Sequence, residues 1–113
     1  MQVDRDEKDI VWMGDSLEVL SGFPKSVKVD LGSDIYRLQI GSVPLDSKPM
    51  KTVGRGVREL RARDSNDQYR TMYVVKKGDL VVVLHSFIKK TRQTSKSDID
   101  LAKHRLKEFN NQA

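Results

Sequence analysis

The fold is decided by the stretch Leu80-Val81-Val82-Val83-Leu84-His85-Ser86-Phe87-Ile88-Lys89-Lys90-Thr91. Its first five residues are apolar at both alternating positions, which predicts a strand at the centre of a sheet with cover on each face. Two lysines end the apolar run and lead into the polar residues 91–96. A strand end that holds paired cations beside a basic loop is suited to binding phosphate. The stretch therefore predicts the middle of a sheet and a candidate site at its end.

Two more strands are predicted upstream, so that the three are expected at residues 53–63, 69–76 and 79–88. Lys77-Gly78-Asp79 supplies a tight turn between the last two, and the polar residues 64–68 supply the turn before them. Arginines occur in both upstream strands. The three strands together suggest a cationic sheet surface that grips RNA.

The other segments predict one short strand, at residues 9–13, and three helices. The first helix lies within residues 14–23, and the second begins at Pro24 and ends before the loop of residues 42–51. The second helix carries an apolar stripe at helical spacing, made by Val27, Leu31, Ile35 and Leu38.

The last helix opens at Ser95, with Asp98 three residues later as a capping partner. Its buried stripe is predicted to be Ile99, Ala102, Leu106 and Phe109. The expected fold is α+β in the order β-α-α-β-β-β-α. A helical hairpin is expected to pack on one side of a small, mainly antiparallel sheet.

Composition restricts the class of protein. A chain of 113 residues is expected to form one domain over residues 1–113, with the charged residues 1–8 as a flexible N-terminus. There is no cysteine and there are only two histidines, so no disulfide, thiol nucleophile, metal site or cofactor is expected. No segment resembles a signal peptide or a membrane span, which predicts a cytoplasmic protein without a membrane partner.

The net charge of +5 is unevenly distributed. Residues 51–113 carry 15 Lys and Arg against seven acids, whereas residues 1–50 carry six against nine. A basic half commonly marks a polyanion partner such as nucleic acid. A solvated charged face would show the same excess, so charge alone leaves both interpretations open.

Four motifs in sequence resemble a known family: Glu59-Leu60-Arg61, Tyr69-Arg70 with Tyr73, the Phe87-x-Lys89-Lys90-Thr91 segment, and the helix with Ala102 and Arg105. They follow one another as in the phage-derived HigB-like toxins of the RelE/ParE superfamily. The resemblance implies a RelE-like fold and an endoribonuclease that cleaves mRNA on the translating ribosome. It also implies a helix-turn-helix antitoxin of the HigA-like kind, expected to contact the basic half of the chain. The chain departs from the pattern at Arg58, usually a bulky apolar residue, and at Ser95, usually a proline.

RNA can be cut without a metal ion when its own 2′-OH attacks the adjacent phosphate. That reaction needs a base, a cation for the equatorial oxygens and an acid for the leaving oxygen. Arginine cannot be the base, because guanidinium does not lose its proton in proteins. The catalytic candidates are the cations and the proton-transfer groups of the three strands: Arg61, Arg70, Lys89, Lys90, His85 and Tyr73.

Each candidate also has a structural interpretation. Arg61 and Arg70 could be ion-paired, and the lysines could be a solvated strand end. His85 could be a core histidine, and Tyr73 could serve packing alone. Four further cations are predicted to bind RNA: Arg58, Arg63, Arg92 and Lys96. The rival to a nuclease is a non-catalytic module on the same fold that binds nucleic acid or a host protein such as gyrase.

The alternation of side chains along a strand places Glu59 and Arg61 on one face and Arg58 on the other. The same rule predicts one shared face in the last strand for Val81, Val83, His85, Phe87 and Lys89.

Overall fold

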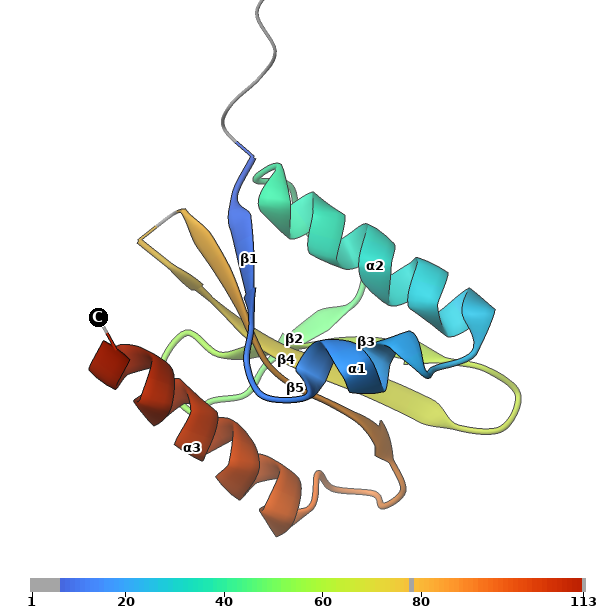
Figure 1. Ribbon diagram of the computed structural model, residues 1–113. Coiled ribbons are helices and arrows are strands. Elements are labelled where there is room, and N and C mark those ends of the chain that lie inside the picture. The colour runs from blue at the N-terminus through green and yellow to red at the C-terminus, as the bar shows by residue number, and fades with distance from the viewer. Residues whose placement is uncertain (1–6, 78, 113) are drawn as a thin grey trace, which may run out of the picture.

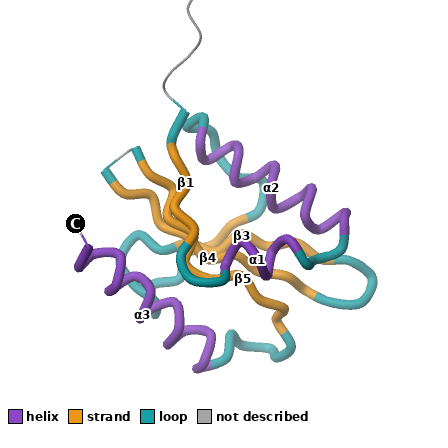
Figure 2. The backbone as a smooth tube through the Cα atoms, in the orientation of Figure 1, coloured by secondary structure: helices purple, strands orange, loops and turns teal. Residues whose placement is uncertain are grey.

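A five-stranded sheet lies between two helical layers in the computed structural model, which describes residues 7–77 and 79–112. Two helices cover one face and the third covers the other, as the two views of the backbone both show (Figures 1 and 2). The elements are β1 (Asp9–Trp12), α1 (Ser16–Ser21), α2 (Lys25–Gln39), β2 (Ser47–Pro49), β3 (Arg58–Arg63), β4 (Gln68–Lys76), β5 (Leu80–Lys89) and α3 (Lys96–Gln112). The predicted α+β class is confirmed, with one strand more than the predicted order.

The strand order is β1-β5-β4-β3-β2. β5 lies second in this order and is flanked by β1, which is parallel to it, and by β4, which is antiparallel. Residues 81–84 are fully buried, because α1 and α2 cover one face of this strand and α3 covers the other. The prediction of a doubly covered apolar strand is confirmed.

The helical stripes pack as their spacing predicts. Val27, Leu31, Ile35 and Leu38 of α2 join the core on the first face of the sheet, with Leu60 and Tyr69. Ala102 of α3 lies in the core on the second face, with Ile99, Leu106 and Phe109 packed around it. The Oγ of Ser95 accepts a hydrogen bond from the backbone N–H of Asp98 at 3.1 Å, so the predicted cap is present and the helix begins one residue after it.

The region before β3 differs from the prediction. Residues 53–57 are not strand: Val53 and Val57 are buried under the second face while the chain turns, with Gly56 at φ +80°. Residues 47–49, expected to be loop, form the edge strand β2. The strand expected from residue 53 therefore begins only at Arg58, because turn geometry and the burial of Val53 and Val57 decide the conformation of the residues before it.

At the N-terminus, the predicted flexible segment falls mostly on residues 1–6, which lie outside the described residues. Lys8 is held by Gln39, since its backbone N–H donates to the Gln39 carbonyl and its own carbonyl accepts from Gln39 Nε2, both at 2.8 Å. The predicted turn Lys77-Gly78-Asp79 contains Gly78, which is likewise outside the described residues, and the pairing of Lys76 with Leu80 is that of a tight hairpin. Within residues 7–77 and 79–112, no helix has both the length and the apolar character to cross a membrane.

A β-bulge interrupts β5. Met72 of β4 pairs with His85, but the next residue, Tyr73, pairs with Val83, so Leu84 is an extra residue on β5. An extra residue reverses which face the following side chains take. The bulge therefore divides β5 into two parts of opposite alternation.

The expected shared face of β5 is wrong for this reason. Val81 and Val83 lie against α2, whereas Phe87 lies in the core beside α3 and His85 contacts α3 directly. Lys89 follows the second pattern. The sequence gives no local sign of the extra residue, because Leu84 is as apolar as its neighbours.

Candidate functional site

Side chains from four strands converge on one buried carboxylate, that of Glu59. Pairing places Lys48 of β2 directly across from Glu59, and places Arg61 across from Arg70 on β4. The positive charges of Arg70, Lys48, Lys89 and Arg61 all act on the Glu59 carboxylate. We call Lys48, Arg61, Arg70 and Lys89 the cationic cluster.

Glu59 and Arg70 form the floor of the site. Glu59 is 0% exposed and Arg70 is 6% exposed, and 3.3 Å separates Arg70 Nε from Glu59 Oε1. The contact is an ion pair without hydrogen-bond alignment, because neither Glu59 oxygen nor Arg70 Nε has a hydrogen-bond partner among the described residues. Burial raises the pKa of Glu59, and Arg70 is the strongest opposing influence.

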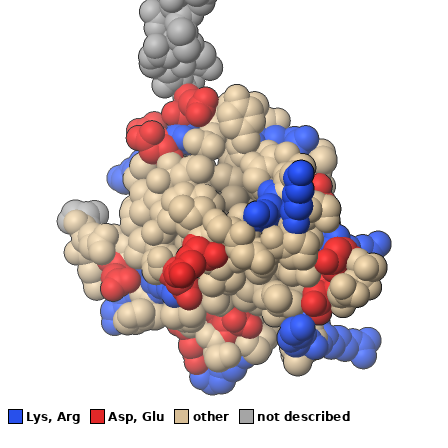
Figure 3. Space-filling view, turned by 45° about the vertical axis from the view of Figure 1, so that its right-hand side comes forward, with Lys and Arg blue, Asp and Glu red and all other residues tan. Residues whose placement is uncertain are grey.

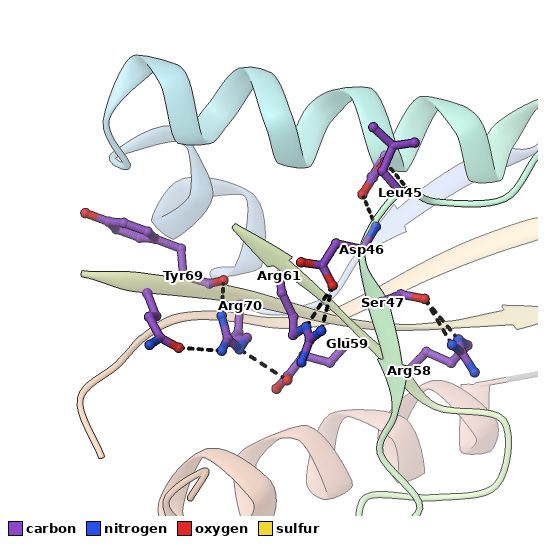
Figure 4. Close-up of polar contacts among 10 residues, drawn as sticks. Leu45, Asp46, Ser47, Arg58, Glu59, Arg61, Tyr69 and Arg70 are labelled. Carbon is purple, nitrogen blue, oxygen red and sulfur yellow. Dashed lines mark hydrogen bonds and ion pairs between the residues drawn. The ribbon is translucent and has the colours of Figure 1, made fainter. Parts of the chain in front are cut away.

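The guanidinium of Arg70 is held from three directions. Its Nη1 donates to the Tyr69 carbonyl at 3.1 Å, its Nη2 donates to Gln68 Oε1 at 2.7 Å, and Glu59 lies beside its Nε. Figure 4 shows Arg70 and Arg61 reaching different acidic partners from neighbouring strands. Arg70 is therefore a fixed positive charge in the floor, and these partners offset the cost of burying it.

Arg61, Lys48 and Lys89 form the accessible rim. Arg61 Nε and Nη2 both contact Asp46 Oδ1, at 2.9 and 2.8 Å, and the Arg61 side chain is 37% exposed. Burial lowers the pKa of Lys89, and the neighbouring charges of Arg70 and Lys48 lower it further. A lysine with a lowered pKa is better able to transfer a proton near neutral pH than an ordinary surface lysine.

A hollow of about 640 Å³ adjoins the cluster between α2 and the edge of the sheet. Arg61 and Arg70 line it on one side, and Arg37, Asp30 and Asp46 line it on others. The space is large enough for a nucleotide beside the cationic rim.

The bulge is held by Arg105 of α3. Arg105 Nη1 donates to the Leu84 carbonyl at 3.0 Å, and its Nη2 contacts Asp15 Oδ1 at 2.8 Å. Asp15 is matched to this cation, since its hydrogen bond with Arg105 lowers the pKa of its carboxyl. Gly14 leaves room for the guanidinium, because a Cβ there would lie 2.5 Å from it. The residue Arg105 thus supports the strand geometry that brings Lys89 to Arg70.

His85 lies on the same face but in different surroundings. Its Nε2 is 2.7 Å from Asp98 Oδ1, and its ring stacks on Phe87 with centroids 4.9 Å apart. Phe87 lies directly across from Arg70, so an aromatic ring borders the floor next to His85. His85 is buried, and its Nδ1 has no hydrogen-bond partner among the described residues.

The structure brings three of the predicted catalytic residues together, namely Arg61, Arg70 and Lys89. Tyr73 is on the opposite face, buried against α2, where burial raises its pKa; it is not part of the cluster. Lys90 turns away to Asp67 at 3.0 Å. The structural interpretation of these two residues agrees with their positions.

The predicted RNA-binding cations are also dispersed. Arg58 donates to Ser47 Oγ on the α2 face, and Lys96 pairs with Asp100 at 2.6 Å. Arg63 ends β3 at the rim of a hollow that Lys89 and Lys90 also line, and Arg92 is exposed in the loop before α3. Acidic and basic side chains alternate over the face in Figure 3, so no continuous cationic surface appears there.

Two residues of the site were not predicted, Glu59 and Lys48. Alternation placed Glu59 on the face of Arg61, so a buried counter-ion could have been inferred from the strand pattern. Lys48 lay in an expected loop, and no local signal marked β2. Within the described part of the chain, no group of three His, Asp or Glu side chains could hold a metal ion.

Comparison with protein families matches residues 18–107 to the family described as "Phage derived protein Gp49-like (DUF891)". No curated protein matches the chain.

Proposed function

Because the chain belongs to the phage-derived Gp49-like family, part of the RelE/ParE toxin–antitoxin superfamily, we propose that it is a HigB-like toxin that cleaves mRNA on the translating ribosome. In the reaction we propose, the RNA 2′-oxygen bonds to the adjacent phosphorus as the 2′-OH loses its proton, the bond from phosphorus to the 5′-oxygen breaks, and that oxygen leaves after it gains a proton; no metal ion takes part. Its partners are then a helix-turn-helix antitoxin, the ribosome and mRNA.

One observation carries this proposal: cations from four strands converge on a single face around Glu59. Cations that share one small area repel one another, so such a cluster is suited to binding an anion. Glu59 offsets part of the charge from below, while the rim cations stay accessible to a phosphate from above. A scissile phosphate gains charge as it is attacked, which makes such preorganised cations effective in the transition state.

The residues take different roles in this reaction. Arg61 contacts the phosphate oxygens after leaving Asp46, and Arg70 contributes a fixed charge held by Glu59 and Gln68. Lys89, whose charge lies close enough to Arg70 and Glu59 to interact with both, donates a proton to the leaving 5′-oxygen, while water accepts the proton of the 2′-OH. His85 has a structural role in this proposal, because its ring is buried and its Nε2 contacts Asp98.

The test is a substrate with its nucleophile removed. A translated mRNA that carries a 2′-deoxy nucleotide at the mapped cleavage position should stay intact, while the all-ribose mRNA should be cut to a 2′,3′-cyclic or 3′-phosphate end. Equal cleavage of the two would exclude attack by the 2′-OH. An all-ribose mRNA that stays intact on translating ribosomes would exclude the nuclease itself.

The non-catalytic alternative has one observation in its favour. Arg70 and Arg61 are both bonded to groups of the chain itself, as expected of structural arginines. A protein that binds nucleic acid without cutting it would show salt-dependent binding in the same assay with no new RNA ends.

A further inference from the structure

The outer face of α2 carries an apolar stripe that the chain's own core does not use. Val29, Tyr36 and Ile40 are 57%, 52% and 48% exposed, on the side of the helix opposite to the buried stripe. They line a surface hollow of about 680 Å³. Exposed apolar residues gathered in one hollow are characteristic of a binding surface.

Gly32 is one of the residues that line this hollow, and it lies in the middle of the helix. A Cβ at this position would meet nothing within 4 Å among the described residues. Glycine inside a helix is unfavourable relative to alanine, and here no packing against another described residue requires it. The absence of a side chain at Gly32 leaves space in the hollow for a side chain of a binding partner.

The charges at the hollow select the kind of occupant. Lys28 and Arg37 border it, and no acidic side chain is among its lining residues. A second copy packed antiparallel across Gly32 and Ser33 would place Lys28 opposite Arg37, two like charges. A partner with carboxylates at the edges of its apolar surface would instead be attracted to Lys28 and also to Arg37, whose other contact is with Asp34 at 2.9 Å.

We call the hollow lined by Val29, Gly32, Tyr36 and Ile40 the α2 groove. We propose that it binds an amphipathic helix of a protein partner, with acidic residues on each side of that helix's apolar stripe. Helices commonly dock in this way, with apolar anchors at helical spacing in a groove. The α2 groove shares Ser33 and Arg37 with the hollow beside Arg61 and Arg70. A helix bound there would lie next to the cationic cluster while contacting none of its four residues.

The experiment uses a synthetic helical peptide with one leucine stripe flanked by glutamates, and the full chain without RNA. The wild-type chain should bind it, and a version flanked by lysines should bind at least about tenfold more weakly. Gly32→Gln and Tyr36→Ala should each weaken binding of the glutamate peptide by about tenfold or more. The matched controls are Asn110→Gln on the exposed surface of α3 and Leu17→Ala on α1, which should bind normally.

Thermal unfolding separates binding from folding. Gly32→Gln should raise Tm by about 4 °C, because glutamine is the better helix former, while it weakens binding. A stabilised variant that binds less well supports the groove. Normal peptide binding in both groove variants would overturn the proposal, as would no wild-type binding. Self-association of the wild type that Gly32→Gln abolishes would assign the groove to a second copy. Since RNA is absent and the cluster is untouched, none of these outcomes depends on cleavage.

Discussion

The two ends of the α3-facing side of the sheet use the same strands for different purposes. At one end Val74, Val82 and Leu84 pack against α3 and its residue Ala102. At the other end Glu59 and Arg70 form an ion pair, and Lys89 lies close enough to interact with both charges. The first end is dry and stabilises the fold, whereas the second holds charges whose burial is costly.

The bulge at Leu84 separates the two ends on β5. Without it, simple alternation would place Lys89 on the face of Val83, against α2, and away from Arg70. The extra residue therefore makes the charged end possible without changing the apolar end. Bulges are common next to active sites for this reason.

The largest expected effect is a loss of mRNA cleavage when cations of the charged end are removed. Lys89→Ala and Arg61→Ala should each lower mRNA cleavage about 10²–10³-fold, since the first removes the proton donor and the second removes a cation that contacts the developing phosphate charge. Neither substitution should change the free energy of unfolding much, because the side chains of Lys89 and Arg61 are both partly exposed. Cleavage rates in a reconstituted translation system, with denaturant unfolding alongside, would measure both quantities.

Lys90→Ala is the matched control, as this neighbouring lysine turns to Asp67 and lies outside the cluster. Its cleavage rate should stay within about threefold of the wild type. Equal losses from Lys89→Ala and Lys90→Ala would show that total charge, and not the geometry of the cluster, is what matters.

A second, intermediate effect concerns the link between the two ends. Arg105→Ala should cost about 2–3 kcal/mol of unfolding free energy, because it leaves the buried Leu84 carbonyl without its charged donor. It should also lower the cleavage rate of the folded fraction, since the bulge that positions Lys89 loses its support. Denaturant titration and cleavage at matched folded concentration would measure the two effects.

Lys103→Ala, on the exposed surface of α3, should change neither quantity. Arg105→Lys should restore part of the stability, because a lysine can donate to the Leu84 carbonyl but lacks the second branch that contacts Asp15. If folded Arg105→Ala cleaved mRNA at the wild-type rate, the contact of Arg105 with the bulge would not be needed to position Lys89.

The sequence predicted the apolar end well and the charged end in part. Helical spacing identified the buried stripes, because only the positions that face the core are apolar. The continuous apolar run at residues 80–84 identified the strand that is covered on both faces. The sequence predicts one cluster of Arg61, Arg70, Lys89 and Lys90, and the structure brings the first three together while Lys90 turns to Asp67. Their shared face was not predictable, since it depends on an extra residue that looks like any other strand residue.

Glu59 and Lys48 show a different limit. The partners of a charge across a sheet depend on strand pairing, and β2 has only three residues, too few for a pattern. The cationic surface is also smaller than the sequence predicts. Asp46, Asp67 and Asp100 neutralise cations that a count of the basic half treats as free.

The smallest expected effect tests whether the lysines from opposite sides of the charged end act on each other. Lys48 and Lys89 come from β2 and β5, and the charge of Lys48 lowers the pKa of Lys89. Lys48→Ala should therefore raise the pKa of Lys89 toward its ordinary value of 10.5, while Lys90→Ala should leave it unchanged. NMR titration of the Lys89 side-chain resonances would measure the shift.

The lowered pKa of Lys89 also predicts how the free energy of unfolding changes with pH. Because the pKa of Lys89 is lower in the folded chain than in an unfolded one, the folded chain binds fewer protons between that lowered value and 10.5. The Lys89 contribution to the free energy of unfolding therefore rises with pH in this window, and Lys48→Ala should make that rise smaller. An unchanged Lys89 titration in Lys48→Ala would mean that the two ammonium groups do not share one site, and the cluster would then lose its member from β2.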